Sequence, residues 1–146
     1  MSADKVADEV IAAMQSTQYG LIVVNFANGD MVGHTGKREA ILQTVEALDY
    51  QVGRVLDFAE CNGFSVVSTA DHGNCEEMVD PITGEPHTQH TIYPVPCLIM
   101  DQDAWQLSTV GGLSAIAPTV LHLMGLRIPE KMSGRSRLLK PIQRDA

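Results

Sequence analysis

Candidate metal ligands fall at three places in this sequence of 146 residues, two with an aspartate and a histidine and one with two histidines, and both residue types bind divalent metals. These residues are, in chain order, Asp30, His34, Asp71, His72, His87 and His90. The first two are four residues apart, the next two are adjacent, and the last two lie in one polar loop. Carboxylates and imidazoles together suit zinc, manganese or a similar ion. Two ions would fit such grouped ligands, and two-metal sites favour displacement at phosphorus.

Each piece of this set also has an ordinary structural explanation. Asp30 can be a turn residue, Asp71 can cap a helix, and loop histidines are commonly exposed to solvent. Four of the five histidines nevertheless fall in these three places, which favours a metal site over coincidence. The fifth, His122, lies among apolar residues of a predicted helix and is interpreted as a core or helix-surface residue.

Neighbouring polar residues have two readings each. Asn25, Asn28 and Asn74 could orient metal ligands, but turn formation explains Asn28 and Asn74 equally well. Glu76 and Glu77 could be general bases, but we expect them to begin a helix, where acidic residues are favoured. None of these five residues is counted in the predicted site.

Helices and strands alternate along the chain and must position these side chains. Apolar residues at helical spacing predict helices, β-branched runs predict strands, and glycine-rich segments predict loops. We expect helices at 2–17, 37–60 and 114–124, strands at 21–26, 64–68, 95–100 and 105–110, and a glycine-punctuated loop at 27–36.

The order strand, helix, strand at 21–68 predicts a βαβ unit, whose two strands are parallel with a right-handed crossover. The expected fold is therefore α/β, with a mostly parallel sheet and flanking helices. Ligands of such sheets lie beyond the carboxyl ends of the strands, which is where Asp30, His34, Asp71 and His72 fall.

Charge is uneven along the chain, whose net charge is −8. Residues before Arg127 include 16 acids and 4 bases, whereas the segment from Arg127 to Ala146 has 6 bases and 2 acids. An acidic body is a poor surface for nucleic acid, and it would repel a phosphate ester unless bound cations reversed the local sign. We expect the basic tail to pack on its own domain, with contact to a partner as the alternative.

Cysteine spacing and hydropathy exclude further classes. The three cysteines form no CxxC pair, so neither a disulfide framework nor a thiolate zinc knuckle is predicted. No apolar stretch approaches the roughly 20 residues needed to cross a bilayer. The expected location is cytoplasmic.

Several segments closely resemble cofactor-independent phosphoglycerate mutase, a family of the alkaline phosphatase superfamily. They are Asn25 to Gly36 (NFANGDMVGHTG), Ser68 to Asn74 (STADHGN), His87 to Thr91 (HTQHT), Pro94 to Pro96 (PVP), Leu123 to Leu126 (LMGL) and Pro129 to Gly134 (PEKMSG). The resemblance extends over nearly the whole chain and keeps the family's order.

The resemblance implies two manganese ions, with cobalt or zinc as possible substitutes. One ion would be bound by Asp30, His34 and His90, and the second by Asp71 and His72. In the family, the phosphoryl group of a monophosphoglycerate moves to a serine and then to the other hydroxyl of the same glycerate. That reaction interconverts 3-phosphoglycerate and 2-phosphoglycerate in glycolysis.

His90 is preferred to His87 because it stands before the Thr-x-x-Pro-Val-Pro stretch, and His87 remains the alternative ligand. The family's nucleophilic serine, a further aspartate ligand and its inserted substrate domain have no counterpart in residues 1–146. Ser65 and Ser68 lack the context of that serine.

We therefore expect residues 1–146 to be the C-terminal portion of the phosphatase domain, inactive alone. We expect the full-length parent to be a monomer and this chain to self-associate through an incomplete sheet. Two other functions remain open: another metal-dependent phosphohydrolase or phosphomutase of the superfamily, and a noncatalytic metal-binding or assembly module.

Overall fold

A computed structural model describes residues 2–142, which form two compact units. The first unit holds residues 2–62 and 72–95, and the second holds residues 63–71 and 96–142. Residues 143–146, the end of the expected domain and of its basic tail, lie outside the described residues. The chain is of the α/β class, as expected.

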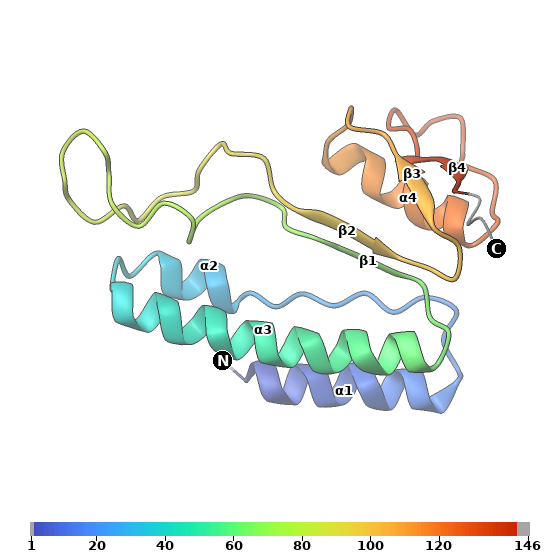
Figure 1. Cartoon of the computed structure of the whole chain (residues 1–146), viewed down its shortest axis with the longest axis horizontal. Helices are drawn as coiled ribbons and strands as arrows, with labels where there is room; N and C mark the ends of the chain where they lie inside the picture. The colour runs from blue at the N-terminus through green and yellow to red at the C-terminus, as the bar shows by residue number, and fades with distance from the viewer. Residues whose placement is uncertain (1, 143–146) are drawn as a thin grey trace. The chain divides into compact units, whose positions relative to one another are not determined.

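Two helices pack along each other in the first unit, α1 (Ala3–Ser16) and α3 (Arg38–Cys61) (Figure 1). Both were predicted from their apolar spacing and both are confirmed. Their buried side chains are Ala3, Ala7, Val10, Met14, Ile41 and Ala59. An ion pair of 2.7 Å between Arg54 of α3 and Asp8 of α1 links the two helices at their surface.

The expected strand at 21–26 is not found, although Figure 1 draws this segment as an extended trace between α1 and α2 (Asn28–Gly33). Three of its apolar side chains are exposed, with Leu21 54%, Val23 85% and Val24 40% exposed, while Ile22 and Phe26 are half-buried. A β-branched run favours extended backbone, but a strand also needs a neighbour that accepts its ladder of hydrogen bonds. Among residues 2–142 the segment has no such neighbour, so the predicted βαβ unit is absent.

An exposed, extended segment with apolar side chains, such as residues 21–26, is prone to pair with the same segment of another copy of the chain. We therefore expect the wild-type chain to self-associate at micromolar concentrations, and Val23→Lys to shift it toward monomer, because an edge lysine opposes pairing. Sedimentation velocity over a concentration series measures this shift. Val110→Lys is the matched control, since Val110 is 84% exposed but lies outside this segment. A stable wild-type monomer would contradict the expectation.

Two antiparallel pairs make up the strands of the second unit. Strand β1 (Val66–Thr69) pairs with β2 (Cys97–Met100), and β3 (Trp105–Leu107) pairs with β4 (Leu138–Pro141) through one irregularity. The expected strands at 95–100 and 105–110 therefore exist in shortened form, and the strand expected at 64–68 is found at 66–69. The mostly parallel sheet is not found, since every strand pair within residues 2–142 is antiparallel.

The C-terminal segment packs on the second unit, as expected for its described part. The predicted last helix is present as η1 (Leu113–Ala115) and α4 (Ile116–Leu123). Buried Thr119 of α4 donates its hydroxyl to the Ala115 carbonyl and accepts the Arg137 backbone N–H at 2.8 Å. This contact fixes the start of β4, which was not predicted. None of the helices within residues 2–142 has the length and apolarity that a membrane span requires.

Candidate metal centre

Asp30 and His34 lie on one side of a short helix rather than in the expected loop. Helix α2 (Asn28–Gly33) carries Asp30 in its first turn, and His34 caps its end. The His34 backbone N–H donates to the Asp30 carbonyl at 3.2 Å, which is the i, i+4 relation of an α-helix. Side chains four residues apart in a helix are neighbours, so this single turn brings the carboxylate and the imidazole together.

A long loop of the first unit returns His90 to the same place. An isolated antiparallel bridge joins Gly73 to Thr91, with the Thr91 N–H donating to the Gly73 carbonyl at 2.9 Å. A second bridge between Val79 and Pro86 closes the far part of the loop. The bridges set His72 and His90 side by side, and their rings stack with centroids 3.6 Å apart.

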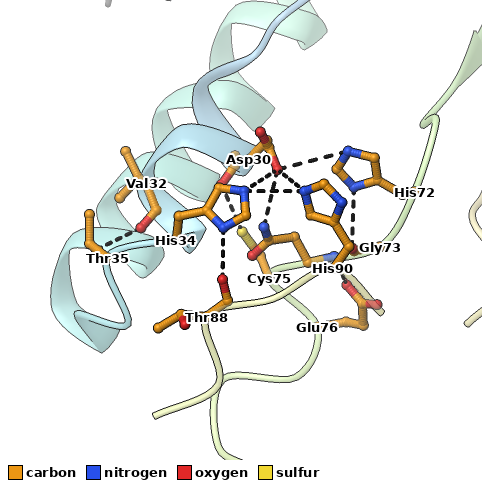
Figure 2. A network of polar contacts seen from close by, with 12 residues as sticks. Asp30, Val32, His34, Thr35, His72, Gly73, Cys75, Glu76, Thr88 and His90 are labelled. Atoms are coloured by element: carbon orange, nitrogen blue, oxygen red, sulfur yellow. Dashed lines mark hydrogen bonds and ion pairs between the residues drawn. The ribbon is translucent and has the colours of Figure 1, made fainter. Parts of the chain in front are cut away.

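Three donor atoms form a nearly equilateral triangle at this point (Figure 2). The Asp30 Oδ1 lies 3.1 Å from the His34 Nε2 and 3.0 Å from the His90 Nε2, and the two nitrogens are 3.1 Å apart. Ligands about 2.1 Å from one ion lie about 3.0 Å apart in an octahedron and about 3.4 Å apart in a tetrahedron. The triangle therefore has the size of one face of a metal coordination shell.

A hydrogen bond sets the orientation of the His34 ring. Its Nδ1 lies 2.7 Å from the Thr88 carbonyl oxygen, which can only accept a hydrogen bond. Nδ1 therefore carries a proton, and Nε2 is the ring nitrogen that faces Asp30 and His90. Metal-binding histidines in proteins are commonly oriented in this way by a backbone carbonyl.

The carboxylate of Asp30 is held in its ionised form. Partial burial opposes ionisation, but the hydrogen bond from Asn74, the attraction of His34 and the contacts with His90 outweigh it, so the pKa of Asp30 lies below its ordinary value. The Asn74 Nδ2 donates to Asp30 Oδ1 at 3.2 Å, and Asn74 itself is buried. The site thus presents a negative oxygen beside two imidazole nitrogens, which is a donor set for a divalent cation.

The other predicted ligands take different places. His72 Nε2 lies 3.8 Å from Asp30 Oδ1, beside the triangle but outside it. Asp71 is exposed and follows β1 in the second unit. His87 Nε2 lies 3.9 Å from a carboxylate oxygen of Glu77, so of the two loop histidines the structure brings His90, not His87, to Asp30.

Sequence reasoning missed one residue that contacts the site, Asn74, and one that contacts the segments on either side of it, Glu76. Asn74 was not counted, yet its amide holds Asp30. Glu76 and Glu77 were expected to begin a helix, which is wrong because residues 72–95 contain none. The Glu76 carboxylate accepts the Asn74 backbone N–H at 2.7 Å and the Thr91 hydroxyl. In the sequence, only their closeness to Asp71 and His72 pointed to Asn74 and Glu76. That closeness does not reveal which residues they contact.

The amino-acid sequence of the chain is similar to a known superfamily and to several named proteins. Residues 1–128 match the Metalloenzyme superfamily. The 2,3-bisphosphoglycerate-independent phosphoglycerate mutase of Rhodopirellula baltica is 51% identical over 137 residues, which are 92% of this chain and 25% of that protein. Mutase 2 of Methanosarcina barkeri is 48% identical over 140 residues, which are 96% of this chain and 27% of that protein.

A solved structure agrees with the sequence relatives. The crystal structure of Leishmania mexicana phosphoglycerate mutase at low cobalt concentration matches 95% of this chain and 28% of its own, with a TM-score of 0.84 and 31% identity. This chain therefore spans about a quarter of the length of the curated relatives that it matches.

Proposed function

This chain belongs to the Metalloenzyme superfamily, and from that premise we propose that it is the metal-binding part of a cofactor-independent phosphoglycerate mutase. The observation that carries the proposal is the triangle of Asp30, His34 and His90 donor atoms. Its support is the 51% and 48% identity to the two mutases, which extends over more than nine tenths of this chain. We propose that the domain is an incomplete alkaline-phosphatase-like domain.

Asp30, His34 and His90 would hold one divalent ion, and Asp71 with His72 would contribute to a second. We propose manganese for both, with cobalt or zinc as substitutes, because all three accept mixed oxygen and nitrogen ligands. Such ions supply positive charge that polarises a phosphate group and activates an oxygen nucleophile. That charge also resolves the electrostatic difficulty of a chain of net charge −8 acting on an anionic ester.

Asp30 and His34 have separate tasks in binding the ion. Asp30 supplies the negative charge that attracts the cation, and His34 presents its Nε2 because Thr88 holds its Nδ1 proton. Cys75 lies near the centre but is not one of the three donors of the triangle. Burial, followed by the charges of Glu76 and Asp30, raises the pKa of its thiol, which donates to the Gly29 carbonyl at 3.2 Å.

The substrate of the whole protein would be a phosphoglycerate, and its reaction the glycolytic interconversion of the 3-phospho and 2-phospho isomers in the cytoplasm. The reaction needs a serine nucleophile, and none of the residues of this chain has that role in the proposal. We therefore expect the chain alone to bind metal without catalysing turnover. The full-length protein would act as a monomeric isomerase.

Calorimetric titration with Mn²⁺ tests the proposal, using the wild-type chain, His34→Ala and His122→Ala. We expect His34→Ala to lose binding, because it removes one corner of the triangle. His122→Ala should bind like wild type, because His122 is an exposed residue of the second unit that contacts Ser136 and Trp105. A parallel assay with 3-phosphoglycerate should show no turnover by any of the three. Turnover by the isolated chain, or no Mn²⁺ binding by wild type, would contradict the proposal.

A further inference from the structure

We propose that Glu76 is a positioning residue that joins the two segments carrying the metal ligands and sets the affinity of the centre. The inference rests on the proposed function, because it concerns how the same centre is held. Glu76 is not a ligand in this proposal, and it lies outside the triangle of Asp30, His34 and His90. Its role is to fix the loop that returns His90.

The carboxylate of Glu76 accepts two hydrogen bonds from opposite sides of that loop. Its Oε2 accepts the backbone N–H of Asn74 at 2.7 Å, and its Oε1 accepts the hydroxyl of Thr91. The bridge between Gly73 and Thr91 joins the same two segments through their backbones. Hydrogen bonds to an ionised acceptor are stronger than neutral ones, so one carboxylate reinforces a bridge of a single residue pair.

Both segments lead directly to the metal centre. On one side, the Asn74 side chain donates to Asp30 Oδ1 at 3.2 Å. On the other, Thr91 follows His90, whose Nε2 lies 3.0 Å from the same oxygen. A displacement of either segment therefore changes a distance within the triangle. Figure 2 shows Glu76 near Gly73, away from Asp30 and His34.

The backbone at residue 73 is adapted to this contact. A Cβ atom on Gly73 would overlap both the Glu76 carboxylate and the Thr91 hydroxyl, so a side chain there would separate the two. The ionised state of Glu76 is favoured as well. Burial opposes it, but the hydrogen bonds from Thr91 and Asn74 outweigh burial and lower the pKa of Glu76.

Glu77 provides a matched comparison, because it is the adjacent glutamate with different partners. It accepts the Tyr93 hydroxyl at 2.7 Å and lies 3.9 Å from the His87 Nε2. Neither partner belongs to the triangle. Glu76→Gln and Glu77→Gln remove the same charge from neighbouring positions, so any general electrostatic effect on a cation should be similar in both.

Titration with Co²⁺, followed by visible absorption and calorimetry, tests the inference on the whole chain. Glutamine has the shape of glutamate, but its NH₂ group would face either the Asn74 backbone N–H or the Thr91 hydroxyl, and both of these groups donate to Glu76. We expect Glu76→Gln to weaken Co²⁺ binding about 10-fold, the lower end of the loss for groups that hold a metal ligand directly, because Glu76 holds the neighbours of the ligands and not the ligands themselves. We also expect an altered d–d spectrum at saturation. Glu77→Gln should stay within about twofold of wild type.

The spectrum separates positioning from folding. If Glu76 only stabilised the fold, Glu76→Gln would lower the melting temperature of the metal-free chain and leave the Co²⁺ affinity and spectrum unchanged below that temperature. That result would overturn the inference. Equal weakening by Glu77→Gln would overturn it as well. No Co²⁺ or Mn²⁺ binding by the wild-type chain would instead overturn the proposed function, and the positioning role with it.

Discussion

Asp30→Asn should lower the affinity of the chain for Mn²⁺ at least about 100-fold, because ligating carboxylates must carry their charge. Asp30 is the one carboxylate of the triangle, and its Oδ1 also receives the contacts of Asn74 and His72. An amide of nearly the same shape offers a neutral oxygen or a donor in its place. Of all substitutions at the centre, this one removes the most charge with the least change in volume.

Thermal unfolding with and without Mn²⁺ measures the effect independently of calorimetry. An ion at 100 times its Kd stabilises the folded state by about 2.7 kcal/mol. We expect that increment in wild type and, at the same Mn²⁺ concentration, at most about 0.4 kcal/mol in Asp30→Asn. Asp57→Asn is the matched control, because Asp57 is an exposed aspartate of α3. An undiminished increment in Asp30→Asn would show that the ion binds elsewhere.

Gly33→Ala and Gly53→Ala should change stability in opposite directions. A Cβ on Gly33, the last residue of α2, would overlap the buried side-chain amide of Asn74. We expect a loss of about 1 to 3 kcal/mol, the usual cost of inserting a group into filled space. Gly53 lies within α3 and its Cβ would meet no atom within 4 Å. Alanine there should stabilise by about 0.5 to 1 kcal/mol, since glycine is unfavourable inside a helix.

Chemical denaturation gives the two free energies of unfolding, and Mn²⁺ titration adds a second readout. Gly33→Ala should also weaken metal binding about tenfold, because Asn74 can no longer hold Asp30 in place. Gly53→Ala should bind like wild type. If the two variants proved equally stable, the close approach of Asn74 to Gly33 would not constrain the centre.

The sequence allowed α1, α3 and α4 to be predicted, because the spacing of apolar residues in a helix is local information. Apolar residues repeat through α1 and α3 over several turns, so their period is readable. The ligand set was predicted from the grouping of histidines and aspartates and from the family resemblance. The structure gathers Asp30, His34 and His90 as that resemblance implied, while Asp71 and His72 as ligands of a second ion stay a prediction.

Features that depend on distant partners were not predictable. A strand at 21–26 requires a neighbour to receive its hydrogen bonds, and no local pattern reports whether one is present. Helix α2 has six residues, too few for a periodic signal, and its two glycines, Gly29 and Gly33, are typical of a loop. Glu76 acquires its role from Thr91, 15 residues away, which its own surroundings in the sequence do not indicate.

The separation of the ligands along the chain has a consequence for folding. Asp30 and His90 are 60 residues apart, so an ion bound by both would close that length of chain into a ring. A covalent link across a ring of that size removes about 4 kcal/mol of conformational freedom from the unfolded chain. A coordinated ion differs from such a link, because the unfolded chain does not hold the ligands together and so keeps that freedom. Folding must therefore bring the two ends of this 60-residue stretch together before the ion can bind both of them.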